Sequence, residues 1–444
     1  MQKTQLPLAK VLPVTADVND AGHLAVGGCD LVTLAEEFGT PLYVFDEETL
    51  RGQCKAFLQA FRSQYPDTAV AYAAKAYLGR ALAAIVAQEG LDLDVVSGGE
   101  LAIAKSVNFP PERIHFHGNN KSADELNDAL DYGIGRVIVD NFHEIALLDS
   151  IARGRGIRQK VLLRLSPGVD PHTHRLTTTG ITDSKFGIAV VTGQAESAVR
   201  QVLEMPGLEL VGLHVHLGSP IFELEPFAEA VDVIFGFAAQ MREKTGWVMQ
   251  EFSPGGGFAV DYIDEHDAPS PAQYAEVVVK GIRAGCERYG LPEPRVFIEP
   301  GRSIVARAGV ALYTVGSSKE IPGVRRYVSV DGGMADNIRP ALYESQYAAL
   351  VANKPLETKR ETVTVAGKYC ESGDVLMRDA ALAPLEAGDI LVMPAAGAYA
   401  LSMASNYNAS LRPALVLAAN GEAKLMRRRE TYDDLMRADV WPLE

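Results

Sequence analysis

The feature that most constrains the fold is a regular alternation of short apolar segments with helix-like segments between residues 68 and 303. The apolar segments are rich in β-branched residues, and each is followed by glycine, polar or charged residues, which is typical of strands that alternate with helices. We predict eight such strands, at residues 69–73, 91–96, 113–116, 136–139, 161–165, 210–215, 250–253 and 295–298. Eight strand–helix units in roughly 240 residues have the number and size of a (β/α)8 barrel.

The remainder of the chain has a different pattern. Short β-type segments separated by turns predict strands at 310–315, 326–330, 361–366, 389–393, 414–419 and 424–428, the last two joined by a hairpin at Asn420-Gly421. Residues 24–26 and 42–45 also have strand character. We therefore predict an α/β protein in which residues 46–308 form the barrel, while residues 1–45 and 309–444 form one discontinuous, mainly β domain.

Composition limits the classes of partner. The 444 residues are 47% hydrophobic and 22% charged, as in an ordinary globular protein, and the net charge is −15. An acidic chain is poorly suited to nucleic acid or an anionic membrane, so we expect a small-molecule partner and neither of those. No apolar run approaches the roughly 18 residues of a membrane span, and residues 1–10 lack a signal-peptide core, which predicts a cytoplasmic protein.

The cysteines indicate neither disulfides nor a structural metal site. The four residues Cys29, Cys54, Cys286 and Cys370 are widely spaced, and none belongs to a CxxC pair. Each is therefore interpreted from its surroundings.

Polar side chains follow most of the predicted barrel strands, at the end where a barrel of this kind opens. One of them, Lys75, ends a segment of small apolar residues, and burial there would lower the pKa of its amine, as a Schiff-base lysine requires. The alternative is a lysine that extends to the barrel rim.

Two glycine-containing segments follow the last two strands. Gly255, Gly256 and Gly257 follow the seventh, and Glu299-Pro-Gly-Arg302 follows the eighth. These are positions where barrels bind phosphate through backbone N–H groups, although Gly-Gly-Gly alone is also typical of a flexible turn. A lysine amine, a glycine-lined phosphate site and a carboxylate for a pyridinium nitrogen together predict pyridoxal 5′-phosphate.

Three His-x-His pairs occur, His115/His117, His172/His174 and His214/His216. No carboxylate-rich ligand set or HExxH motif accompanies them, so we predict no metal site. His216 is instead suited to stacking its flat imidazole ring on the ring of the cofactor, and Ser219 is available to bind the cofactor's phosphate.

Motifs in one order along nearly the whole chain carry a resemblance to a known family. They are Tyr72–Ala76, Leu93–Glu100, His117–Lys121, His214–Ser219, Gly255–Phe258, Glu299–Arg302, Asp331–Met334, Asn337–Pro340, Cys370–Asp374 and Gly397–Tyr399. In these segments the chain resembles the diaminopimelate decarboxylases, which belong to the alanine-racemase-like, fold type III group of pyridoxal-phosphate enzymes. Tyr77 and Pro220 depart from that family's usual pattern.

The resemblance implies a role for each matching residue. Lys75 would bind the cofactor covalently, His216 would stack on its ring with support from Asp94, and Glu299 would pair with the pyridinium nitrogen. Cys370 would return a proton to the substrate carbon and would come from the second subunit of a homodimer. The residues around the phosphate or the neighbouring substrate would be Ser219, Gly257, Gly301, Arg302 and Tyr399, and those gripping the distal end of the substrate Arg302, Arg339, Tyr343 and Glu371.

The predicted reaction is therefore decarboxylation of meso-2,6-diaminopimelate to L-lysine and CO2, the last step of lysine biosynthesis. A decarboxylase of lysine, ornithine or arginine is the alternative enzyme, and a non-catalytic pyridoxal-phosphate-binding regulator is the alternative of another class. The second carboxylate of diaminopimelate needs a guanidinium partner, which Arg339 and Arg302 supply.

Overall fold

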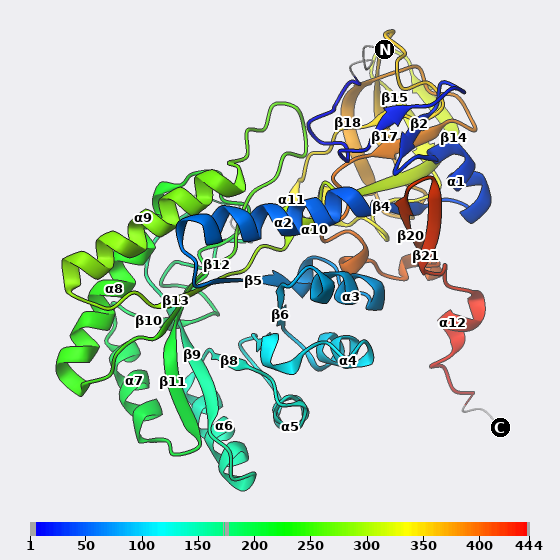
Figure 1. Ribbon diagram of the computed structural model, residues 1–444. Coiled ribbons are helices and arrows are strands. Elements are labelled where there is room, and N and C mark those ends of the chain that lie inside the picture. Colours follow the sequence, from blue (N-terminus) through cyan, green and yellow to red (C-terminus); the bar gives the residue numbers. More distant parts are fainter. Residues whose placement is uncertain (1–5, 172, 174–176, 442–444) are drawn as a thin grey trace. The chain divides into compact units, whose positions relative to one another are not determined.

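The computed structural model describes residues 6–171, 173 and 177–441, which divide into two compact units (Figure 1). The barrel unit is the described part of residues 53–259 and 268–303. The β unit is the described part of residues 1–52, 260–267 and 304–444, so it draws on both ends of the chain.

Eight parallel strands close the barrel and confirm the predicted fold class. They follow one another in chain order around the ring, and the last pairs with the first. The strands are β5 (Thr68–Ala73), β6 (Asp92–Val95), β7 (Ile114–Phe116), β8 (Arg136–Val139), β9 (Gln159–Ser166), β11 (Leu208–His214), β12 (Glu251–Gly255) and β13 (Arg295–Ile298). The short β10 (Ile188–Ala189) pairs beside the end of β9.

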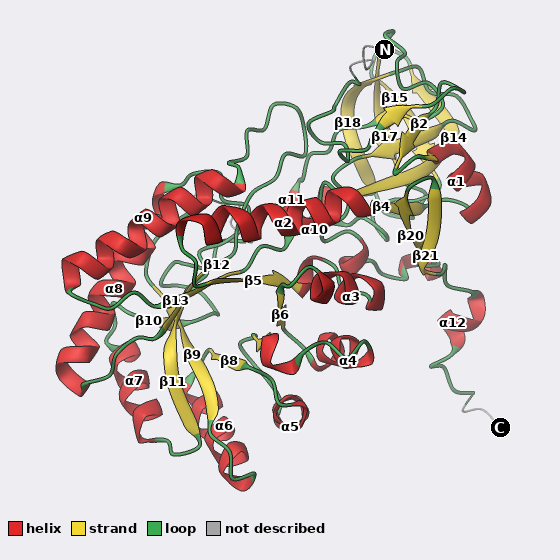
Figure 2. Cartoon of the chain, in the orientation of Figure 1, coloured by secondary structure: helices red, strands yellow, loops and turns green. Residues whose placement is uncertain are grey.

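Helices connect the barrel strands and surround them (Figure 2). They are α2 (Glu47–Gln64, which starts in the β unit), α3 (Arg80–Gln88), α4 (Gly98–Ser106), α5 (Ala123–Tyr132), α6 (Phe142–Gly154), α7 (Gln194–Glu204), α8 (Glu225–Thr245) and α9 (Pro271–Tyr289). Local sequence sets several of their starts. Ser122 and Glu125 form a capping box on α5, and Ser270 and Gln273 form another on α9.

The β unit is built around the long strand β14 (Gly309–Ile321). Its large sheet runs in the order β18 (Val375–Leu382), β17 (Glu361–Ala366), β15 (Arg325–Val330), β14, β4 (Leu42–Asp46), β20 (Ala414–Ala419) and β21 (Glu422–Arg427), while β19 (Ile390–Met393) pairs with β14 and β16 (Leu350–Val351). The N-terminal strand β4 lies between β14 and β20, which confirms the discontinuous domain. The predicted strand at 24–26 belongs instead to a small separate sheet of β1 (Asp17–Val18), β2 (Leu24–Val26) and β3 (Cys29–Asp30).

Short elements complete the β unit, namely α1 (Leu31–Phe38), α10 (Arg302–Val305, which begins in the barrel unit), α11 (Arg339–Tyr343) and α12 (Tyr432–Met436). Among the helices that the structure describes, none is long and apolar enough to cross a membrane.

Candidate active site

A buried carboxylate at the end of β13 is the centre of the barrel site. Both oxygens of Glu299 have partners, since Ser253 Oγ donates to Oε1 at 2.9 Å and His214 Nε2 lies 3.0 Å from Oε2. Ser253 belongs to β12 and His214 ends β11, so three neighbouring strand ends fix this carboxylate. Its orientation is set before any ligand binds.

The pKa of Glu299 and that of a second buried carboxylate, Asp94 on β6, are shifted in opposite directions. Burial acts to raise the pKa of Glu299, but His214 and His117 beside it bring that pKa well below its usual value. Burial, and then the charge of Glu299, raise the pKa of Asp94 well above its usual value. His117 Nε2 lies 3.6 Å from both carboxylates. The site therefore keeps Glu299 ionised while Asp94 tends to hold a proton.

Neighbouring backbone lies close to the glycine triplet that begins with Gly255, the last residue of β12. A Cβ at Gly256 would lie 2.2 Å from the Glu299 carbonyl oxygen, and one at Gly257, whose φ is +103°, would lie 2.4 Å from the Gly218 carbonyl oxygen. Any side chain here would separate the loops that follow three adjacent strands. The backbone of the triplet is therefore free of side chains that would block an approaching anion, as an anion-binding loop requires.

Lys75 differs from its sequence-based prediction in one respect. It lies in a single 3-10 turn (Ala74–Ala76) directly after β5, and its side chain is exposed while Ala74 and Ala76 are buried. The predicted burial of the amine is therefore wrong. Two alanines anchor the turn and leave the amine accessible.

His216 and Arg302 border the glycine loop. His216 Nδ1 accepts the Gly256 N–H at 3.2 Å, and Arg302 Nε donates to Ser219 Oγ at 3.3 Å. Burial, with Lys75 and Arg164 as further causes, lowers the pKa of His216 well below its usual value, so the ring is neutral at pH 7. A neutral flat imidazole is suited to stacking on an aromatic cofactor. The contact predicted between Asp94 and His216 stays a prediction.

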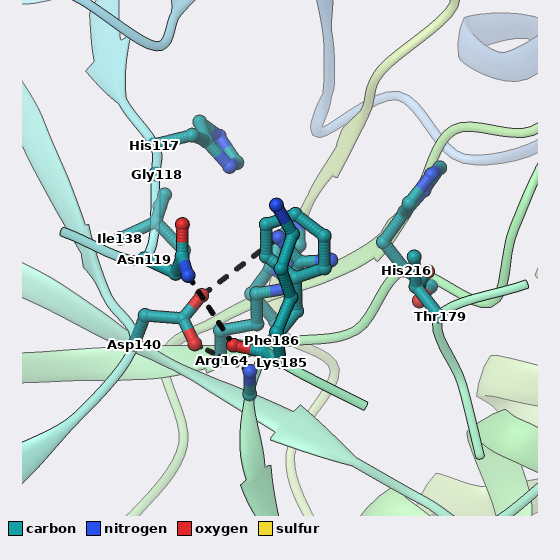
Figure 3. A network of polar contacts seen from close by, with 12 residues as sticks. His117, Gly118, Asn119, Ile138, Asp140, Arg164, Thr179, Lys185, Phe186 and His216 are labelled. Atoms are coloured by element: carbon teal, nitrogen blue, oxygen red, sulfur yellow. Dashed lines mark hydrogen bonds and ion pairs between the residues drawn. The ribbon is translucent and has the colours of Figure 1, made fainter. Parts of the chain in front are cut away.

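Figure 3 shows a further network, centred on Asp140 at the end of β8. Its carboxylate accepts the N–H of Gly187 and lies 3.9 Å from the guanidinium of the buried Arg164. Arg164 also stacks on Phe186, 4.5 Å from the ring centroid. Burial lowers the pKa of Arg164, whereas Asp140 acts to raise it. Asp140 and Arg164 thus hold the segment around Phe186 against the barrel end.

The lysine of the His117–Lys121 motif has a structural role. Lys121 is buried, and its ammonium group contacts Glu144 at 2.6 Å and the carbonyl oxygens of Gly118 and Ile138 at 2.8 Å each. Glu144 in turn accepts the backbone N–H of Asp140 at 3.0 Å. This ion pair joins the loops after β7 and β8, which carry His117 and Asp140.

The histidines of the His-x-His pairs lie in different surroundings. His117 and His214, together with Glu299, place possible metal-ligand atoms within 4.8 Å of one another. His214 and Ser253 both contact the Glu299 carboxylate, so these two side chains also hold that carboxylate in place. His115 lies deeper, 3.3 Å from Asp92, and His172 and His174 lie outside the described residues. Sequence reasoning gave no separate role to His117, His214 or Ser253.

The β unit carries the second group of predicted residues. Arg339 is buried on α11, and its guanidinium lies 5.3 to 5.9 Å from the ring centroids of Tyr262, Tyr343 and Tyr399. One nitrogen donates to Ser345 at 3.2 Å, but Nε is buried without a hydrogen-bond partner among the described residues. An unpaired buried guanidinium N–H calls for an anionic or carbonyl acceptor.

Cys370 and Glu371 are both exposed, at the connection between β17 and β18 in the β unit. The other three cysteines are buried, and all four are free thiols. Within the described residues Cys370 is thus the one thiol open to a reacting partner.

The barrel site fits pyridoxal 5′-phosphate. It offers an accessible amine on Lys75, a glycine loop free of side chains and a carboxylate on Glu299 whose pKa is well below its usual value. One oxygen of Asp94 and Nε2 of His117 are also buried without hydrogen-bond partners within the described part of the chain. Such orphaned polar atoms are expected where a polar ligand binds.

Comparisons with known proteins agree with this chemistry. Residues 51–306 match the family model described as the pyridoxal binding domain of pyridoxal-dependent decarboxylases. The chain is 48% identical to the diaminopimelate decarboxylase of Bacillus subtilis over 96% of this chain and 97% of that one. It also resembles crystal structures of the M. jannaschii diaminopimelate decarboxylase, with a TM-score of 0.91 at 36% identity over 97% and 98% of the two chains. The complex of that enzyme with L-lysine gives a TM-score of 0.90.

Proposed function

Because the chain belongs to the diaminopimelate decarboxylase family of pyridoxal-dependent decarboxylases, we propose that it converts meso-2,6-diaminopimelate to L-lysine and CO2. The observation that carries this proposal is the buried Glu299 carboxylate, whose two oxygens contact Ser253 and His214 and whose pKa is well below its usual value. A decarboxylase with this cofactor needs an anion at the pyridine nitrogen.

The residues of the barrel unit prepare the cofactor. Bound pyridoxal 5′-phosphate supplies an electron sink for the pair left by departing CO2. Lys75 binds the cofactor through its amine, and Glu299 holds a proton on the ring nitrogen, which strengthens that sink. The neutral His216 ring stacks on the cofactor, while Ser219 and the N–H groups of the glycine cradle bind the phosphate.

The residues of the β unit recognise the substrate and complete proton transfer. Arg339 binds the distal carboxylate, for which its unpaired Nε is available. Tyr343, Tyr399, Glu371 and Arg302 orient the rest of the distal amino-acid group. The Cys370 thiol then gives its proton to the carbon from which CO2 has left, and solvent reprotonates the thiolate. We further propose a homodimer in which one subunit supplies Cys370 to its partner's barrel.

A cytoplasmic location is also proposed. Its support is the set of four free thiols, three of them buried, which suits a reducing compartment.

The test of the reaction is release of CO2 from meso-diaminopimelate, lysine, ornithine and arginine, measured side by side. We expect turnover of diaminopimelate with L-lysine as product, and a preference for another of the four would overturn the assignment. Borohydride reduction should fix the cofactor on Lys75, and Lys75→Ala should abolish both this labelling and turnover. Label on a different lysine would contradict the role of Lys75.

A further inference from the structure

The segment that carries Cys370 is a hairpin connection with one buried member. Residues 367–374 join β17 to β18, whose last and first residues, Ala366 and Val375, are paired just beyond a register irregularity between Val365 and Ala366. Cys370 and Glu371 are exposed, whereas Asp374 is 3% exposed. A carboxylate buried at the base of an exposed connection needs strong partners.

Asp374 finds these partners in two backbone N–H groups. Its Oδ2 accepts the N–H of Tyr369 at 2.9 Å, and its Oδ1 accepts the N–H of Met334 at 2.7 Å. The first bond holds the residue that precedes Cys370. The second attaches the connection to the loop after β15, so one side chain ties the two segments together.

Two glycines make room for this carboxylate. A Cβ on Gly367 would lie 2.1 Å from Asp374 Oδ2, and a Cβ on Gly333 would lie 2.4 Å from Oδ1. Neither position tolerates a side chain unless the carboxylate moves. Both loops are therefore shaped around Asp374.

A second side chain holds Cys370 directly. Asn408 Oδ1 accepts the N–H of Cys370 at 3.0 Å, and the hydroxyl of Tyr407 donates to the Cys370 carbonyl oxygen at 3.4 Å. Tyr369 is itself anchored through its hydroxyl, 3.1 Å from Ser410 Oγ. Side chains thus hold the backbone around the thiol, in addition to the hydrogen bond from the Glu371 N–H to the Tyr369 carbonyl oxygen at 2.8 Å.

We propose that Asp374 is a positioning residue for Cys370, with Asn408 as its second support. This inference rests on the proposed function, in which Cys370 is the proton donor. A proton donor acts only when its atom is placed closely, and a misplacement of about 1 Å can cost on the order of 100-fold in rate. The connection has backbone hydrogen bonds of its own, from Gly367 to Asp374, Lys368 to Gly332 and Glu371 to Tyr369, and the side chains of Asp374 and Asn408 add the contacts at Tyr369 and Cys370.

The first experiment replaces Asp374 by asparagine, which keeps the shape but presents an NH2 group to one of the two N–H donors. We expect kcat to fall about 10- to 100-fold, with KM within a few-fold, because Arg339 is untouched. In the apoprotein, hydrogen exchange of peptides covering 367–374 should become faster. Asp389→Asn is the matched control, since Asp389 is a buried carboxylate of the same unit that accepts the Glu386 N–H at 2.7 Å. It should leave exchange in 367–374 unchanged.

A double-mutant cycle separates positioning from general stability. In a Cys370→Ser background, Asp374→Asn should cause little further loss of kcat, because the residue acts through the thiol. An equal loss in both backgrounds would overturn the positioning role. Unchanged kcat in a folded Asp374→Asn protein would also overturn the positioning role. If the kcat of Cys370→Ser alone is greatly reduced, the proposed function still stands. Full activity of Cys370→Ser would instead refute the proton-donor role.

A second variant covers the case in which Asp374→Asn does not fold. Asn408 has a φ of +50°, so Asn408→Gly removes its side chain without backbone strain. We expect faster exchange at the Cys370 amide and a several-fold lower kcat. An Asn408→Gly protein with wild-type kcat and a wild-type exchange rate at the Cys370 amide would overturn the proposal.

Discussion

At the scale of single residues, neighbours decide the charge of each buried carboxyl group. Asp336 in the β unit accepts hydrogen bonds from the Tyr313 hydroxyl at 2.6 Å, the Tyr43 hydroxyl at 3.2 Å and the Gly333 N–H at 2.8 Å. Burial nevertheless dominates and raises the pKa of Asp336 to about 6. The pKa of Glu299 is instead well below its usual value because His214 and His117 lie beside it.

The raised pKa of Asp336 predicts a pH dependence of stability. The folded protein keeps the Asp336 proton up to about pH 6, whereas the unfolded chain releases it near pH 4, so folding takes up a proton between these values. The contribution of Asp336 is full below pH 4 and is lost as pH rises to about 6. Relative to Asp336→Asn, the wild type should lose about 2 to 3 kcal/mol of unfolding free energy across this window. Urea unfolding of the wild type and of Asp336→Asn at pH 4.5 and pH 7 measures this difference in unfolding free energy. Equal changes in the two proteins between these pH values would contradict the prediction.

Arg339 predicts a specificity effect. A charge-assisted contact to the distal carboxylate is worth roughly 2 to 4 kcal/mol, so Arg339→Ala should lower kcat/KM for diaminopimelate by about 10- to 1000-fold, mainly through KM. Arg437→Ala, at the exposed end of α12, is the control and should behave as wild type. Unchanged kinetics of Arg339→Ala would mean that the distal carboxylate binds elsewhere.

At the scale of elements, the strands of the barrel were predictable because their signals are local. Seven of the eight contain β-branched residues, β12 being the exception, and the predicted and observed ranges overlap in all eight cases. The strand β18 was not predicted, since Val375–Leu382 mixes exposed and buried residues without regular alternation. The exposure of Lys75 depends on a single turn, and no pattern encodes that.

Contacts between distant strands were beyond sequence reasoning. His214 and Glu299 are 85 residues apart, and Arg136 and Glu251 are 115 residues apart. Each member could be assigned to a strand, but its partner depends on closure of the barrel. The residues that carry chemistry were therefore found by motif, whereas those that hold them in place required the structure.

The Arg136–Glu251 pair predicts how the barrel is stabilised. These buried side chains start β8 and β12 and form two 2.6 Å bonds, and Arg136 also stacks on Phe297 at 4.6 Å. Glu251→Gln leaves the arginine charge buried and uncompensated, which should cost about 3 to 5 kcal/mol, whereas Arg136→Met with Glu251→Leu should recover most of it. Denaturant unfolding measures this. In the folded variants kcat should remain near wild type, because the active site uses the opposite strand ends.

At the scale of the whole molecule, the proposed site needs groups from both units. Lys75 and Glu299 belong to the barrel unit, and Cys370 and Arg339 belong to the β unit. In the proposed two-fold homodimer, two identical sites would form from reciprocal halves, so each chain would serve as cofactor holder in one site and as proton donor in the other. Defects in the two units should then complement one another.

Mixing Lys75→Ala with Cys370→Ala subunits should therefore restore activity. After random exchange half of the dimers are heterodimers, and each has one site with both defects and one with neither, so recovery should approach about a quarter of wild-type activity. The matched control mixes Lys75→Ala with Glu299→Gln. Both defects then lie in barrel units, every site keeps one, and no recovery is expected. No recovery in the first mixture, despite demonstrated subunit exchange, would place the lysine and the thiol of one site in a single chain. Recovery in the control would instead contradict the assignment of Lys75 and Glu299 to one barrel.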